Sequence, residues 1–334
     1  EGATEFDRDR VCITKTRFAE AIGEILRGEA WGSMDITEPG AGSDMAALRT
    51  RGEQDADGNW FVTGEKIFIT SGHGKYHFVI ARTEEAQEGG DAFAGLKGLS
   101  MFLVPTYATD AAGRKTFHAE FARLEEKLGH HGSATVGICF DRTPAFLVGR
   151  RGEGFRYMLQ LMNNARVAVG FESLGILEAA HRLARAYAAE RRTMGRTIDR
   201  HEMIADYLDE MRTDIQAVRA LAVAGGYHSE LAEKIEMVLR FLPPADEAER
   251  RRLQTRLRRH QRRARFLTPL VKYLASEKAV EHSRRCLQIH GGFGYSTEFG
   301  AEKLLRDAMA LPIYEGTSQI QSLMAMRDNL MGVL

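Results

Sequence analysis

The sequence predicts an α+β fold in which a small β-sheet or barrel domain is followed by an antiparallel four-helix bundle. Short strand-like runs separated by turn signals occupy residues 33–148. Across 149–334 apolar residues recur at helical spacing, with no strand-like runs between the helices. Because the two patterns do not alternate, a β domain joined to a helical bundle is favoured over βαβ units.

The β region is predicted from one hairpin signal and several short apolar runs. Asp57-Gly58 is a hairpin turn signal between residues 50–53 and 60–63. The spacing of the further runs indicates a small sheet or barrel. These further strand-like runs lie at 67–70, 78–81, 99–104 and 135–140.

Four helices are predicted after Gly154. The third covers about residues 270–289 and ends at Gly291-Gly292, as a glycine C-cap would, and the fourth follows Ser318. The first two carry apolar stripes at helical spacing. The stripes consist of Leu174, Leu177, Ala180, Ala184 and Tyr187, and of Ile204, Leu208, Met211, Ile215 and Val218.

Residues 225–268 are unusual and are interpreted as an insertion in the bundle. Pro243-Pro244 interrupts the helical pattern, and residues 250–265 then include nine arginines. Such a basic run could attract phosphates or an anionic surface, but a solvated helix face is the favoured interpretation.

Composition indicates a soluble protein of a reducing compartment, such as the bacterial cytoplasm. The 46 basic and 46 acidic residues give a formal net charge of zero, which does not favour nucleic acid or a membrane surface as a partner. The three cysteines lack metal-ligand spacing, and no metal site is expected. No apolar run approaches membrane-spanning length, and the first residues are too charged for a secretory signal.

Residues 313–321 place one carboxylate, Glu315, on a loop just before a helix. Ser318 and Gln321 have the spacing of a capping box, and Gly316 allows close approach to the backbone. A carboxylate held there could accept a proton from a carbon acid, although a solvated first-turn charge is the plainer alternative. The apolar positions expected behind the loop are Ile320, Leu323, Met324 and Met326.

Residues 37–44, Thr-Glu-Pro-Gly-Ala-Gly-Ser-Asp, form a second motif. Pro39 stiffens the segment, while Gly40 and Gly42 allow a ligand to approach the backbone. On composition alone an ordinary surface turn is equally compatible.

As ordered strings, these segments resemble motifs of the acyl-CoA dehydrogenases. Residues 37–44 resemble the flavin loop of that family, and residues 313–321 its catalytic-base segment. Four further segments resemble family motifs in the expected order, at 64–72, 128–133, 191–196 and 288–294.

The resemblance implies a set of site residues. Glu315 would be the catalytic base, since no acid occurs at 163–166, where some relatives place it. Arg191 would reach the FAD pyrophosphate across a subunit contact. The implied FAD-binding residues are Ile36, Thr37, Ser43, Phe68, Thr70, Arg191, Gln288, Gly292, Thr317 and Gln319. The implied substrate-binding residues are Ser43, Arg166, Tyr314 and Gly316.

The resemblance also implies an activity. An FAD-dependent dehydrogenase of this family converts an acyl-CoA thioester to trans-2-enoyl-CoA and passes electrons to an electron-transfer flavoprotein. A homodimer or homotetramer is expected. A flavin-dependent acyl-CoA oxidase and a non-catalytic flavin- or acyl-CoA-binding relative are the alternatives.

Two departures from the family pattern are expected. Residues 1–32, with one helix near Phe18–Leu26, resemble only a remnant of the N-terminal helical domain that relatives carry. The insertion at 225–268 resembles the enlarged branch that includes 3-methylmercaptopropionyl-CoA dehydrogenase-like proteins.

Overall fold

The computed structural model describes residues 4–84 and 94–330. It contains two compact units. Unit 1 takes in the chain up to Lys127 together with His131–Leu161, and unit 2 takes in Leu128–His130 and the chain from Met162 onward.

Unit 1 is built on a closed ring of paired strands, so the barrel alternative of the prediction is the one observed. In this ring β11 pairs with β5 and β7, β7 pairs with β6, and β4 pairs with β5 and meets β6 at Arg51 and Arg82. The ring strands are β4 (Arg51–Gln54), β5 (Trp60–Thr70), β6 (Tyr76–Arg82), β7 (Leu99–Pro105) and β11 (Thr135–Val148).

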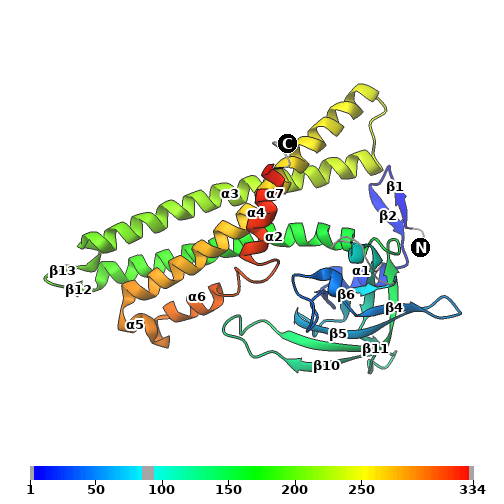
Figure 1. The fold of residues 1–334 in the computed structure, drawn as a ribbon, viewed down its shortest axis with the longest axis horizontal. Helices are drawn as coiled ribbons and strands as arrows, with labels where there is room; N and C mark the ends of the chain where they lie inside the picture. The colour runs from blue at the N-terminus through cyan, green and yellow to red at the C-terminus, as the bar shows by residue number, and fades with distance from the viewer. Residues whose placement is uncertain (1–3, 85–93, 331–334) are drawn as a thin grey trace. The chain divides into compact units, whose positions relative to one another are not determined.

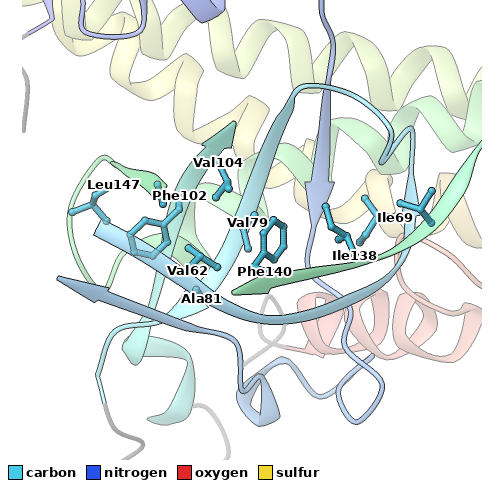
Figure 2. Packing of buried hydrophobic residues seen from close by; sticks show 11 residues of the cluster. Val62, Ile69, Val79, Ala81, Phe102, Val104, Ile138, Phe140 and Leu147 are labelled. Atoms are coloured by element: carbon cyan, nitrogen blue, oxygen red, sulfur yellow. The ribbon is translucent and has the colours of Figure 1, made fainter. Parts of the chain in front are cut away.

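The interior of the barrel is filled by apolar side chains that alternate along the strands. Figure 2 shows residues from separate strands, such as Val62, Phe102 and Phe140, meeting in this core. All three are at most 3% exposed. The predicted hairpin is confirmed, because Gln54 pairs with Trp60 across a turn in which Gly58 has φ 87°.

Gly64 of β5 occupies a position that a side chain cannot fill. Its φ is +150°, and a Cβ there would lie 2.7 Å from Thr50 Cα. We expect Gly64→Ala to lower the free energy of unfolding by about 3 kcal/mol, measured by urea denaturation. Gly132→Ala is the control, since nothing lies within 4 Å of its Cβ. An unchanged urea midpoint for Gly64→Ala would contradict the close approach to Thr50.

Several short elements of unit 1 were not predicted. Strand β3 (Gly32–Asp35) pairs in parallel with β6, and β10 (Ala119–Leu124) pairs with the outer edge of β11. Two small hairpins also form, β1 (Glu5–Asp7) with β2 (Cys12–Lys15) and β8 (Tyr107–Thr109) with β9 (Lys115–Phe117). The predicted helix near the N-terminus is confirmed as α1 (Ala19–Leu26).

Unit 2 is helical. Its long helices are α2 (Gly154–Glu190), which starts in unit 1, α3 (Glu202–Phe241) and α4 (Glu247–His290). Leu177 of α2, Val218 of α3 and Ala275 of α4 are buried in one cluster, so both predicted stripes face a common core. The remaining elements are the hairpin of β12 (Arg192–Thr193) and β13 (Arg196–Thr197), and the helices α5 (Gly292–Tyr295), α6 (Ala301–Ala308) and α7 (Ser318–Leu330).

The predicted start of the third helix near Leu270 is wrong. Helix α4 begins at Glu247, because the Asp246 side chain accepts hydrogen bonds from the N–H groups of Ala248 and Glu249. Residues 225–268 therefore form the end of α3, a short turn and the first half of α4 (Figure 1). The arginine run lies mostly on exposed positions of α4, which confirms the solvated helix face.

The predicted glycine C-cap is confirmed. Gly291 follows the last residue of α4 with φ 61°, and its N–H donates to the carbonyl of Gln288. None of the helices within the described residues combines the length and the apolar character that crossing a membrane requires.

Candidate functional site

In unit 1 the loop at 37–44 is held by a buried ion pair. Lys66 Nζ donates to the Ile36 carbonyl at 2.9 Å and to Glu38 Oε1 at 2.8 Å. The Glu38 carboxylate also accepts hydrogen bonds from the N–H groups of Arg49 and Thr50, at 2.7 and 3.0 Å. Burial raises the pKa of Glu38, but Lys66 and these N–H groups outweigh it and leave that pKa lowered. The loop is thus fixed from its buried side.

The predicted flavin residues of unit 1 lie around this loop. The Thr37 carbonyl accepts a hydrogen bond from Ile67 N at 2.9 Å, which ties the loop to β5. Ser43, Phe68 and Thr70 are exposed. Phe68 is 59% exposed and has φ 58°, a conformation that bulky residues rarely adopt and that is concentrated at functional sites. An accessible flat ring beside polar groups fits a planar cofactor.

In unit 2 the backbone at Glu315 is fixed from two sides. Its carbonyl accepts hydrogen bonds from Arg166 Nε at 3.1 Å and from Gln321 Nε2 at 3.3 Å. Glu315 has φ 56° and Gly316 has φ 94°, so two consecutive residues are in the left-handed region. This strained turn is held in place by the two side chains.

One oxygen of the Glu315 carboxylate is withdrawn from water. Its Oε2 atom is buried and has no hydrogen-bond partner among the described residues. Burial raises the pKa of Glu315, while the charges of Arg166 and Lys272 oppose that rise. The Glu315 carboxylate is therefore not the fully solvated charge of the plainer alternative.

The predicted capping box is also wrong. Thr317, not Ser318, caps α7, because Thr317 Oγ1 accepts from Ile320 N at 3.4 Å. Ser318 Oγ donates instead to Glu277 Oε1, and Gln321 Nε2 reaches the carbonyls of Glu315 and Gly316. The expected apolar positions do not form the buried face either. Leu323 and Met326 are 61% and 59% exposed, whereas Ser318, Gln321 and Ala325 are buried.

Two further groups lie near Glu315. The hydroxyl of Tyr314 donates to Glu172 Oε2, and its ring packs edge-on against His130. Lys272 of α4 is fully buried, and burial lowers its pKa to about 8. Sequence reasoning gave Lys272 no role, assigned Gln321 to a capping box and gave Lys66 no role within the 64–72 segment. Nothing in their local patterns shows that these polar side chains are buried.

A cavity of unit 2, of about 520 Å³, lies where α2 and α4 end. Tyr187 stacks on His290 with ring centroids 4.2 Å apart, and the Arg191 guanidinium lies 5.8 Å from the Phe293 ring centroid. Flat rings and a guanidinium suit a nucleotide with its phosphates. Arg191 and Gly292 line this cavity, whereas the predicted residues Gln288, Thr317 and Gln319 are not among its lining residues in the described chain.

Family models match both units. The model described as acyl-CoA dehydrogenase, middle domain, matches residues 33–143. The model described as acyl-CoA dehydrogenase, C-terminal domain, matches residues 152–235 and 250–330. The residues between these last two segments, 236–249, contain the end of α3, the turn and the first residues of α4.

Comparisons with individual proteins point to the same family as the family models. The chain is 35% identical to 3-methylmercaptopropionyl-CoA dehydrogenase of Ruegeria pomeroyi over 94% of its length, and it spans about half (53%) of that protein. The solved butyryl-CoA dehydrogenase of Megasphaera elsdenii is 25% identical with a TM-score of 0.73, covering 93% of this chain and 71% of its own. A structure described as electron transferring flavoprotein of Acidaminococcus fermentans is 27% identical with a TM-score of 0.73, covering the same shares. The chain therefore belongs to the acyl-CoA dehydrogenase family.

Proposed function

We propose that this protein catalyses the α,β-dehydrogenation of an acyl-CoA thioester to the trans-2-enoyl-CoA. The observation that carries the proposal is the Glu315 carboxylate, which has a raised pKa and a buried, unpartnered oxygen on a backbone held by Arg166 and Gln321. A general base needs a fixed position and a pKa near the working range. The Glu315 backbone is held in place, and burial moves the pKa of its carboxyl upward, in the direction of that range.

The chain's own residues would act as follows. Glu315 takes the α-proton of the thioester, which becomes acidic enough only when charge on the thioester oxygen is stabilised. Gly316, with no side chain, leaves room for the substrate next to the base. Ser43, Arg166 and Tyr314 are the further substrate-binding residues that we propose. Arg166 is buried and bonded to the Glu315 carbonyl, so besides its proposed part in substrate binding it would hold the base in place.

The family is one of FAD flavoproteins, and we propose FAD as the cofactor here. When bound, FAD supplies the acceptor for the hydride that leaves the β-carbon. Ile36, Thr37, Phe68 and Thr70 of unit 1 would hold the flavin, with Ser43 beside them. The proposed residues for the rest of the cofactor are Arg191, Gln288, Gly292, Thr317 and Gln319, and the cavity lined by Arg191 and Gly292 supports the nucleotide part of this proposal.

The remaining assignments follow the family. We propose an electron-transfer flavoprotein as the electron acceptor and a homodimer or homotetramer as the assembly. The bacterial cytoplasm is the proposed compartment. We also propose domains at 33–148 and 149–334. The likeness to the Ruegeria protein favours a short thioester as substrate.

A panel of acyl-CoA thioesters, mixed without oxygen with the FAD-loaded chain, tests the function. We expect at least one to bleach the oxidised flavin band and to yield a trans-2-enoyl-CoA. Hydrogen peroxide formed in air at the same rate as the enoyl-CoA product would indicate the oxidase. Acyl-CoA binding without bleaching by any thioester would indicate a non-catalytic binding protein and contradict the proposal.

A further inference from the structure

Lys272 is a buried cation for which the proposed function has no role. It lies on α4 among core residues, between Val271 and Ala275, which are 1% and 0% exposed. Lys272 itself is fully buried, and its Nζ has no hydrogen-bond partner within the described part of the chain. Lysine almost never occupies such a position unless an opposite charge compensates it.

Three charged groups act on Lys272. Its helix packs against the segment that carries Glu315, because Ala275 and Tyr314 share one cluster and Ser318 bonds to Glu277. Arg166 comes from α2, Lys272 and Glu277 from α4, and Glu315 from the loop before α7. Burial lowers the pKa of Lys272, while Glu277 and Glu315 raise it and Arg166 lowers it further. On the other side of the loop, Glu172 of α2 is bonded to the Tyr314 hydroxyl.

Some of these charged groups have hydrogen-bond partners and others have none among the described residues. The exposed Glu277 already accepts a hydrogen bond from Ser318. Arg166 donates to two neutral oxygens, the carbonyl of Glu315 and the side chain of Asn163. Lys272 Nζ and Glu315 Oε2 are the groups of this cluster that are both buried and unpartnered. Desolvated opposite charges stabilise each other far more than the same charges in water.

We propose that Lys272 is a positioning residue whose buried ammonium, together with the Arg166 guanidinium, keeps the Glu315 carboxylate ionised and ready to accept a proton. The proposal rests on the proposed function only for the role of Glu315 as base. Without a compensating cation, a buried carboxylate takes up a proton from solvent and cannot act as a base.

Infrared difference spectroscopy reads the protonation of Glu315 without turnover. The carboxyl band that is present in the wild-type chain and absent from Glu315→Gln is followed against pH. Lys272→Met removes the charge at nearly constant volume. We expect it to move the midpoint of this band upward by about 1 pH unit, the lower end of the effect of a nearby opposite charge, because Arg166 remains in place. Lys272→Arg is expected to restore most of the wild-type midpoint.

Lys278→Met is the matched control. Lys278 lies on the same helix but is paired with Asp214 and Glu281, so its removal should leave the midpoint unchanged. Lys272→Gln, with folding checked by circular dichroism, supplies a second neutral variant if Lys272→Met does not fold.

The outcomes separate the two proposals. An unchanged midpoint in a folded neutral Lys272 variant overturns the role of Lys272, even if Glu315→Gln is inactive. A raised midpoint, with the acidic limb of the kcat/KM profile raised by the same amount and recovered in Lys272→Arg, supports it. If the midpoint rises but Glu315→Gln retains full dehydrogenase activity, the electrostatic coupling stands and the proposed function fails.

Discussion

Glu315→Gln is expected to lower the rate of flavin reduction by acyl-CoA about 10²- to 10⁴-fold. The amide has nearly the same shape as the carboxylate but cannot accept the α-proton, and loss of a general base has an effect of this size. The backbone contacts from Arg166 and Gln321 end on the Glu315 carbonyl, so the substitution leaves them in place. FAD and acyl-CoA affinities should therefore stay near their wild-type values.

Anaerobic stopped-flow absorbance of the FAD-loaded chain measures this rate. Glu298→Gln is the control, because Glu298 is an exposed carboxylate of the same unit and should leave the rate unchanged. A rate for Glu315→Gln within a few-fold of the wild type would mean that another group takes the proton.

Lys66→Met is expected to lower the free energy of unfolding by about 3–5 kcal/mol. The substitution leaves Glu38, only 7% exposed, without its cation, and an uncompensated buried carboxylate has a cost of this order. The Ile36 carbonyl loses its Lys66 donor as well, so the loop that carries Thr37 should also bind FAD more weakly.

Urea denaturation and FAD titration measure the two effects. The double variant Lys66→Met, Glu38→Gln should recover part of the lost stability, because the uncompensated charge of the Glu38 carboxylate is then removed. Lys97→Met, at an exposed lysine of unit 1, is the control and should change stability by no more than about 0.5 kcal/mol. Equal urea midpoints for Lys66→Met and the wild type would show that this ion pair does not hold the loop.

The elements that the sequence predicted correctly are those governed by local rules. The stripes around Leu177 and Val218, the hairpin at Asp57-Gly58 and the cap at Gly291 each depend on residues close together in the chain. Glu315 was proposed in the same way, since its motif is continuous, and its role as base stays a prediction. The roles predicted for the individual flavin and substrate residues stay predictions.

The errors come from contacts between distant residues. Ser318 would have capped α7, but its hydroxyl is drawn to Glu277, 41 residues earlier. Lys66 and Lys272 are residue types normally found in water, and their burial depends on Glu38 and on the cluster at Glu315. The first half of α4 has only a sparse apolar stripe, at Leu253, Leu257 and Leu267, among its exposed arginines, so its helical periodicity was not recognised.

Helix α4 is continuous from Glu247 to His290, and this continuity fixes the distance between residues along it. At 1.5 Å per residue, Lys272 beside the proposed base and His290 at the nucleotide cavity are about 27 Å apart along one axis. A single residue inserted between them would turn His290 by about 100° and move it about 1.5 Å, away from Tyr187. The exposed arginine-bearing part before Lys272 is free of this restriction. Changes of length can therefore accumulate around the α3–α4 turn while the spacing of the two sites is preserved.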